Sequence, residues 1–236
     1  MEGVFTKMTL KRFFILVCSS FLFCLNAQTP SFEEKIRIQL WGDLDAYPEF
    51  AAATLDEEKG VFDYPIQQIK KTAPFLINGM VYGWDFVYVP YDKTRGVAEY
   101  FEITEIRSIQ QDGQNVIYSS PWIDVEKNRF SCWCEFYRTP DQVKNYKMWS
   151  SIVHPVISGR GYGSVEKGVD GIKLAAEDAL KNAVREYYRE QLKNKPKEIT
   201  GSVLIRSEPL MGVDAGRYAL SLDFFLERGR IKEYKF

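Results

Sequence analysis

The most reactive side chains with a regular spacing are Cys132 and Cys134, which flank Trp133. In an extended strand, residues i and i+2 point to the same face with Cα atoms ~6.6–6.8 Å apart, at the far edge of the disulfide range. Phe130 and Phe136 continue the same alternation, which favours two free thiols buried in a core. A strained disulfide is the alternative, and a metal pair lacks the further ligands that it needs.

His154 is the sole histidine and therefore the one candidate for the general base of a Ser-His-Asp arrangement. It directly precedes Pro155, and no Gly-x-Ser-x-Gly nucleophile elbow occurs in the sequence. A single histidine also excludes a histidine-rich metal site. We expect a structural role for His154.

Three glycines, Gly159, Gly161 and Gly163, separate an expected strand from an expected helix, the position of a phosphate cradle. Ser164 stands where the dinucleotide-binding spacing requires its third glycine, and no Gly-Lys-Ser/Thr follows. The simpler interpretation is a glycine turn, in which the backbone turns sharply or approaches a neighbour.

Two groups of carboxylates are candidates for metal or acid–base sites. Asp43 and Asp45 lack the spaced ligands and the glycine of an EF-hand, which leaves a surface turn. On a strand Glu99 and Glu105 point one way and Glu102 the other, so the spacing does not define a glycosidase pair. The sequence predicts no catalytic residue, no metal and no cofactor.

Aromatic residues make up 15% of the chain, more than one sheet core needs. We expect some of them to form an interaction surface, although a second packed layer would bury them equally well. The candidates for this surface are Trp84, Tyr88, Tyr91, Trp133 and Tyr137, with Tyr100 and Trp122 beside them.

Alternation of apolar and polar residues predicts the strands that position these side chains. The clearest apolar face contains Tyr218, Leu220, Leu222, Phe224 and Leu226. The expected strands cover residues 36–40, 82–91, 97–107, 129–137, 152–158, 199–206, 217–227 and 231–236, and the second and third of them form a hairpin.

Two short helices are expected from their end signals. The first begins near Asp63 and stops at Pro74, because a proline inside a helix removes a hydrogen bond. The second has Thr139 as its N-cap, Pro140 at the first helical position and Gln142 as the reciprocal partner of the cap.

A long helix is predicted over residues 170–194, ending before Pro196. Its apolar side contains Ala175, Ala179 and Ala183, whose small side chains allow close contact with a sheet. The expected fold class is α+β: mostly antiparallel sheet with this helix packed on it and two short helices. Residues 28–150 form an antiparallel-sheet-rich region and residues 151–236 a strand-helix-strand-strand unit.

Residues 1–27 have the pattern of a cleavable export signal, with a basic start, an apolar run from Phe13 to Leu25 and the small Ala27 before the cleavage point. The apolar run is shorter than the ~20 residues that span a bilayer. We therefore expect a mature chain that begins at Gln28 and is periplasmic or secreted.

A lipoprotein signal requires a small residue before the modified cysteine. Val17 precedes Cys18 and Phe23 precedes Cys24, so lipidation is disfavoured and both thiols leave with the signal. Residues 28–236 contain no second apolar run long enough for a membrane span.

Removal of the signal takes away one acid and three bases, which changes the formal charge from −1 to −3. An exported chain with mixed charges and a small negative net charge has no electrostatic footprint for nucleic acid.

The glycines and the alanine-rich segment of residues 157–183 resemble the strand, glycine turn and helix of small bacterial surface lipoproteins and of the N-terminal domain of the flagellar ring protein FlgT. The resemblance implies a non-enzymatic α/β module that serves envelope or flagellar assemblies, and it supplies no catalytic residues. Residues 31–150 have no counterpart in that family. The matching positions are Gly159, Gly161, Ala175, Ala176, Asp178, Ala179, Asn182 and Ala183.

Together these observations favour an exported, non-catalytic structural or adaptor protein with a protein partner in the bacterial envelope. Two alternatives remain open: a secreted hydrolase with carboxylates that the sequence does not identify, and a protein that holds a small ligand between its two halves.

Overall fold

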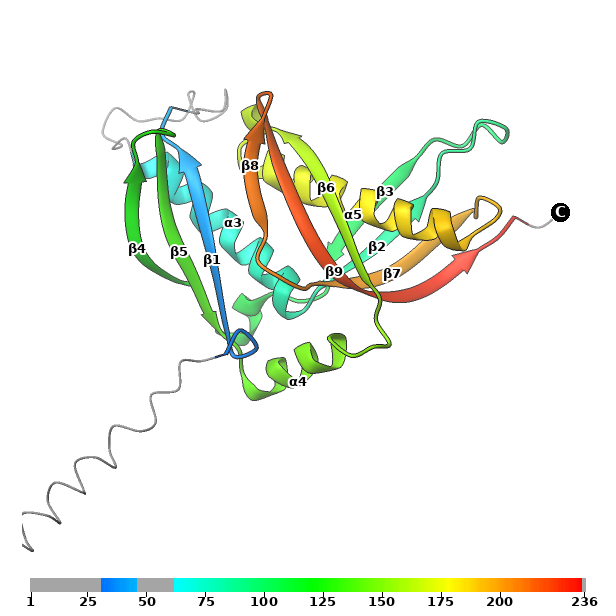
Figure 1. Ribbon diagram of the computed structural model, residues 1–236, viewed down its shortest axis with the longest axis horizontal. Helices are drawn as coiled ribbons and strands as arrows, with labels where there is room; N and C mark the ends of the chain where they lie inside the picture. Colours follow the sequence, from blue (N-terminus) through cyan, green and yellow to red (C-terminus); the bar gives the residue numbers. More distant parts are fainter. Residues whose placement is uncertain (1–30, 46–61, 235–236) are drawn as a thin grey trace, which may run out of the picture. The chain divides into compact units, whose positions relative to one another are not determined.

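The computed structural model describes residues 31–45 and 62–234, and Phe32–Phe236 form one compact unit. The predicted export signal, its cleavage point before Gln28, Cys18 and Cys24 all lie outside the described residues. Within the described part the chain forms three α-helices and nine strands in two antiparallel sheets, which confirms the α+β class (Figure 1).

The smaller sheet has the strand order β1-β5-β4, formed by β1 (Lys35–Asp43), β5 (Arg129–Tyr137) and β4 (Ile117–Asp124). Alternation along β1 and β5 buries Ile36, Ile38, Cys134 and Phe136 on one face, which packs on helix α3. Strand β4 was missed by sequence reasoning because Ser120 has a left-handed φ of 47° and the register shifts between Ser119 and Trp122, which interrupts the alternation.

Helix α3 (Asp63–Val81) is much longer than predicted, because Pro74 lies inside it instead of ending it. The helix contacts β1 and β5 on one side and β7 of the larger sheet on another. Burial on both sides of the proline, by Ile69 and Ala73 before it and Leu76 after it, offsets the ~3 kcal/mol that an interior proline costs.

The larger sheet has the strand order β3-β2-β7-β9-β6, with β8 paired to β9. The predicted hairpin is confirmed by the antiparallel pairing of β2 and β3, and the alternating face of β9 is fully buried. Strand β2 pairs with β3 on one side and with β7, a strand of the predicted C-terminal region, on the other. The two predicted regions therefore share one sheet. The strands are β2 (Trp84–Val89), β3 (Tyr100–Glu105), β6 (Val156–Ser164), β7 (Glu198–Ile205), β8 (Leu210–Asp214) and β9 (Arg217–Lys232).

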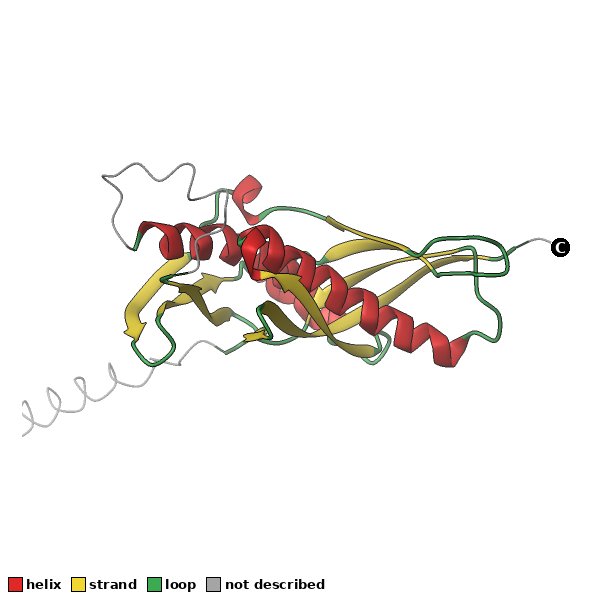
Figure 2. Ribbon diagram, turned by 90° about the horizontal axis from the view of Figure 1, so that it is seen from above, coloured by secondary structure: helices red, strands yellow, loops and turns green. Residues whose placement is uncertain are grey.

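The predicted long helix is confirmed as α5 (Val169–Gln191), which contacts β6 and β9 (Figure 1). In Figure 2 helices, drawn in red, lie against the yellow strands. The glycine turn was wrong: Gly159, Gly161 and Gly163 belong to strand β6, which continues to Ser164. A Cβ atom on Gly161 would lie 2.1 Å from the backbone N of Ala179. These glycines therefore let a strand approach a helix, and the turn follows them in the short 3₁₀ helix η2 (Val165–Lys167).

Helix α4 (Pro140–Trp149) has the predicted capping box between Thr139 and Gln142. Its Trp149 packs on Phe225 of the large sheet, and the His154 ring lies 4.8 Å from that of Trp149. His154 thus has a packing contact at the end of α4. A further 3₁₀ helix, η1 (Ile109–Asp112), precedes β4.

The two thiols of β5 lie on the buried face as predicted, with a separation of 3.9 Å between their sulfur atoms, and both are free. Replacing Cys132 and Cys134 together with alanine is expected to lower the free energy of unfolding by about 1 kcal/mol for each residue, through small cavities. Urea denaturation checks the loss. Unchanged stability with loss of ligand or partner binding would contradict a packing role and identify a functional thiol pair.

Candidate functional site

A cavity of about 740 Å³ lies where the end of α5 and the segment after it meet β2, the start of β3 and β7. We call it the tyrosine cavity because Tyr88, Tyr91 and Tyr188 line it. Pro90 follows the last residue of β2, and Leu192 follows the last residue of α5 with an extended backbone. The strand and the helix therefore both end beside the cavity. In Figure 1 the end of α5 lies beside β2, β3 and β7.

The tyrosines differ in their partners. Tyr88 is 3% exposed, and its hydroxyl donates to Glu99 Oε1 at 3.0 Å. Tyr188 is 4% exposed, and its hydroxyl has no hydrogen-bond partner among the described residues. Burial raises the pKa of both hydroxyls, and for Tyr88 the bond to Glu99 raises it further. Tyr91 is 54% exposed and lies at the mouth.

Positive charge surrounds these rings. Arg185, Arg189, Lys193 and Lys195 line the cavity, against the single carboxylate of Glu99 among the described lining residues. Arg185 donates to the side chain of Asn182 and Arg189 pairs with Glu186, while Arg185 and Lys193 form no ion pair within the described part of the chain. Cations at the end of a helix are favoured by its dipole, which is one reason that they gather here.

One of these cations helps to shape the mouth. Lys195 Nζ donates to the backbone carbonyl of Tyr91 at 2.8 Å and lies 5.9 Å from the Tyr91 ring centroid. The segment after α5 is thereby attached to the segment after β2. The resulting cavity has apolar walls and a positive rim, an arrangement suited to holding a ligand.

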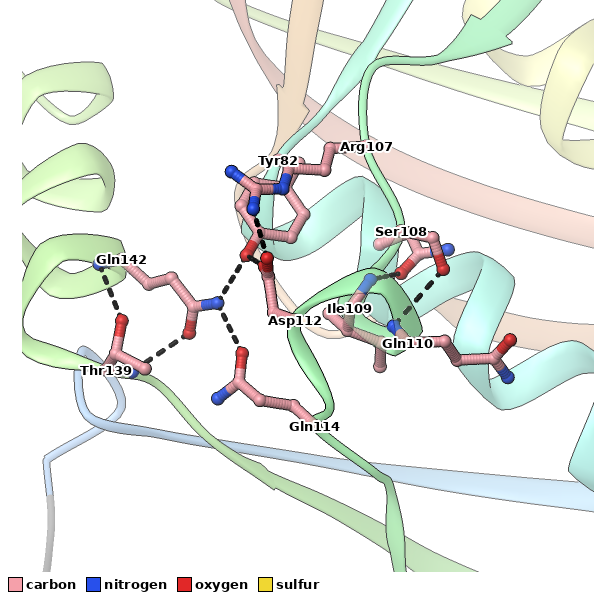
Figure 3. A network of polar contacts seen from close by, with 10 residues as sticks. Tyr82, Arg107, Ser108, Ile109, Gln110, Asp112, Gln114, Thr139 and Gln142 are labelled. Atoms are coloured by element: carbon pink, nitrogen blue, oxygen red, sulfur yellow. Dashed lines mark hydrogen bonds and ion pairs between the residues drawn. The ribbon is translucent and has the colours of Figure 1, made fainter.

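A second cavity, of about 570 Å³, lies beside the start of α4. In Figure 3 the Gln142 amide donates to the Tyr82 hydroxyl at 2.7 Å and to Gln114 Oε1 at 2.6 Å. Asp112 accepts from both Tyr82 and the Arg107 guanidinium. Because Tyr82 and Asp112 already have partners, this network joins α4 to the end of α3 and the η1 segment.

The predicted aromatic surface is divided between separate places. Trp84 is fully buried and stacks on Phe75 with ring centroids 4.9 Å apart. Tyr88 and Tyr91 belong to the tyrosine cavity. Trp133 and Tyr137 lie on the outer face of the small sheet, opposite α3.

We call the outer patch formed by Trp122, Trp133 and Tyr137 the Trp133 face. The Trp122 and Trp133 rings are 6.3 Å apart, and the Arg37 guanidinium lies 4.2 Å from the Trp133 ring centroid. Tyr137 is 48% exposed, with Lys35 over its ring. Tyr100 is also exposed, but it lies on β3 in the larger sheet.

The predicted carboxylate groups are all engaged. Asp43 is the last residue of strand β1, not part of the predicted surface turn, and it pairs with Arg129 of β5 at 2.9 Å, while Asp45 accepts from Asn128. Glu102 accepts from Tyr100 and Glu105 accepts from Asn78, each at 2.5 Å. Of the three predicted glutamates, Glu99 is the one that lines the tyrosine cavity.

Sequence analysis singled out neither Tyr188 nor the cations at the end of α5. A signal was present, because Arg185 and Arg189 are four residues apart and therefore lie on one side of the helix end. The pattern did not reveal which strand that side faces, since β2 lies far away in the chain.

None of the helices in residues 31–45 and 62–234 is long and apolar enough to cross a bilayer.

Comparison with known proteins corrects the predicted resemblance. A model of a family of uncharacterised proteins matches residues 23–234, nearly the whole chain, so the assignment of residues 157–183 to the surface lipoprotein and FlgT family was wrong. Glycines opposite alanines meet a general demand of close strand–helix contact, and unrelated folds meet it with the same residues.

An uncharacterised protein of Treponema pallidum (strain Nichols) is 26% identical over 204 residues, which cover 84% of this chain and 82% of that protein. No solved structure matches the chain significantly. Because the family model covers residues 23–234, the chain belongs to this family of uncharacterised proteins.

Proposed function

We propose that this protein is an exported, non-catalytic binding protein that holds its ligand in the tyrosine cavity. The observation that carries the proposal is a cavity of about 740 Å³ that combines buried tyrosine rings with a surplus of cationic side chains. Apolar walls with a few polar groups around them are typical of sites that hold small ligands.

The cavity supports binding better than hydrolysis. A glycosidase-type mechanism needs two carboxylates, one of them free to donate a proton. Among the described lining residues Glu99 is the one carboxylate, and Tyr88 already donates to it. Export rests on the signal pattern of residues 1–27.

The Trp133 face supports a second candidate function, that of an adaptor for an envelope protein. An antiparallel sheet with one covered face normally presents polar side chains on the other. Here two tryptophans and a tyrosine lie on the side opposite α3, where no other described helix packs, and Tyr137 is 48% exposed. Aromatic residues of this kind are enriched in protein interfaces.

Photo-crosslinking in intact cells tests the two sites against each other. We expect p-benzoylphenylalanine in place of Tyr91 to form an adduct and the same residue in place of Tyr137 to form none, although the two positions have similar exposure, 54% and 48%. Mass spectrometry of the recovered chain measures the adduct and also shows whether the chain begins at Gln28.

The alternatives give different results. An adduct with a protein at Tyr137 alone would favour the adaptor and contradict the cavity. Absence of an adduct at both positions would contradict binding at either site, and a cytoplasmic chain that retains residues 1–27 would contradict export.

A further inference from the structure

Resting on the proposed function, we infer that the ligand of the tyrosine cavity is an apolar carboxylate, that is, a carboxylate group joined to a hydrophobic body. Four features of the cavity carry this inference: its charge, its free donors, its apolar walls and its size.

The charge around the cavity favours an anion. Four cationic side chains line it, and Glu186 neutralises one of them, Arg189. Opposed to them are Glu99 and the end of the α5 dipole, which is equivalent to about half a negative charge. The cations still exceed the negative charges, so a negatively charged ligand lowers the electrostatic energy of this site.

The free hydrogen-bonding groups are donors, which an anionic oxygen satisfies. The Arg185 guanidinium has five N–H groups and gives one bond within the described protein, to Asn182. The Tyr88 hydroxyl is already committed to Glu99 and the Tyr188 hydroxyl is enclosed by protein, so neither is offered to the cavity. A carboxylate has two oxygens, which can accept together from the remaining N–H groups of Arg185.

The walls favour a hydrophobic body over a small inorganic anion. Besides the rings of Tyr88 and Tyr188, the cavity is lined by the apolar residues Leu192, Pro196 and Ile199. The volume of about 740 Å³ falls within the range of cavities that hold drug-sized molecules. A bare phosphate or sulfate leaves these apolar walls in contact with water.

Calorimetric titration of the whole mature chain with three probes of equal chain length tests the inference. We expect decanoate to bind, decanol to bind at least tenfold more weakly, and decyltrimethylammonium to give no measurable heat. In parallel, a leucine-terminated peptide with a free carboxylate is compared with its C-terminal amide. A stronger response to decanoate points to a free acid, and a stronger response to the free-carboxylate peptide points to a polypeptide C-terminus; both support the inference.

Three variants locate the binding. Arg185→Gln is expected to weaken decanoate about tenfold, to the level of decanol. Lys193→Gln is expected to weaken decanoate several-fold, because Lys193 lines the cavity and forms no ion pair within the described residues. Lys144→Gln, on the exposed surface of α4, removes a cation away from the cavity and is expected to leave the affinity unchanged.

Each failure has its own meaning. If decanol or decyltrimethylammonium binds as tightly as decanoate, the ligand class is wrong and the binding function stands. Decanoate affinity that is unchanged in both Arg185→Gln and Lys193→Gln overturns the assignment to this cavity. If no probe binds while the Tyr91 position still forms an adduct, the inference fails alone; without probe binding or adduct, the proposed function fails with it.

Discussion

Gly161→Val is expected to abolish cooperative folding, or to lower the free energy of unfolding by more than about 3 kcal/mol. A Cβ atom at this position would lie 2.1 Å from the backbone N of Ala179 and 2.3 Å from the carbonyl O of Ala175. Both are backbone atoms of α5, which cannot move aside as a flexible side chain would, so the cost exceeds the usual 1–3 kcal/mol of overpacking. Circular dichroism with thermal and urea denaturation measures the loss.

Matched substitutions distinguish the clash of Gly161→Val with α5 from the general effect of replacing a strand glycine by valine. Gly212→Val lies in β8, where no other atom comes within 4 Å of the added Cβ, and it is expected to cost little. Ala179→Trp approaches the same contact from the helix and is expected to be as severe as Gly161→Val, whereas Arg185→Ala, on the exposed side, should change stability by at most ~0.5 kcal/mol. Parental melting of Gly161→Val or Ala179→Trp would show that α5 does not lie on β6.

Arg138→Met is expected to destabilise the fold by roughly 2–4 kcal/mol. Arg138 is 7% exposed, and its guanidinium donates to the carbonyl oxygens of Phe32 at 2.9 Å, Glu33 at 3.1 Å and Met80 at 2.9 Å. Met80 lies in the last turn of α3, so Arg138 satisfies a carbonyl at that helix end and attaches the segment before β1 to it.

The net loss is smaller than the sum of three charge-assisted hydrogen bonds, because burying the charge is itself unfavourable. That burial lowers the pKa of Arg138 to about 10. Urea denaturation of Arg138→Met is best compared with Arg138→Lys, which keeps the charge but loses the planar fork and should have an intermediate stability. Arg37→Met, at an exposed position above Trp133, is the control and should cost less than about 1 kcal/mol. Equal stability of Arg138→Met and the parent would show that these carbonyls do not need the guanidinium.

Local signals correctly predicted the elements whose caps or burial patterns depend on residues close together in the chain. Thr139 and Gln142 form the capping box within four residues. The alternation from Tyr218 to Leu226 shows by itself that one side of this strand is buried. Prediction failed where distant contacts decide the conformation. Pro74 stays inside α3 because packing against two sheets outweighs its local cost, and β6 continues through three glycines because α5 approaches it closely.

The same distinction between local signals and distant contacts applies to the candidate site. The sequence by itself determined the α+β class, the long helix, the buried thiol strand and the presence of more aromatic residues than one core requires. Only the tertiary structure decided that Tyr88 and Tyr188 share a cavity, that Trp84 belongs to the core, and that Trp133 faces outward on another sheet. The reason is physical: periodicity along a chain records that a side chain has a buried or exposed side, whereas a binding cavity depends on which distant strand that side meets.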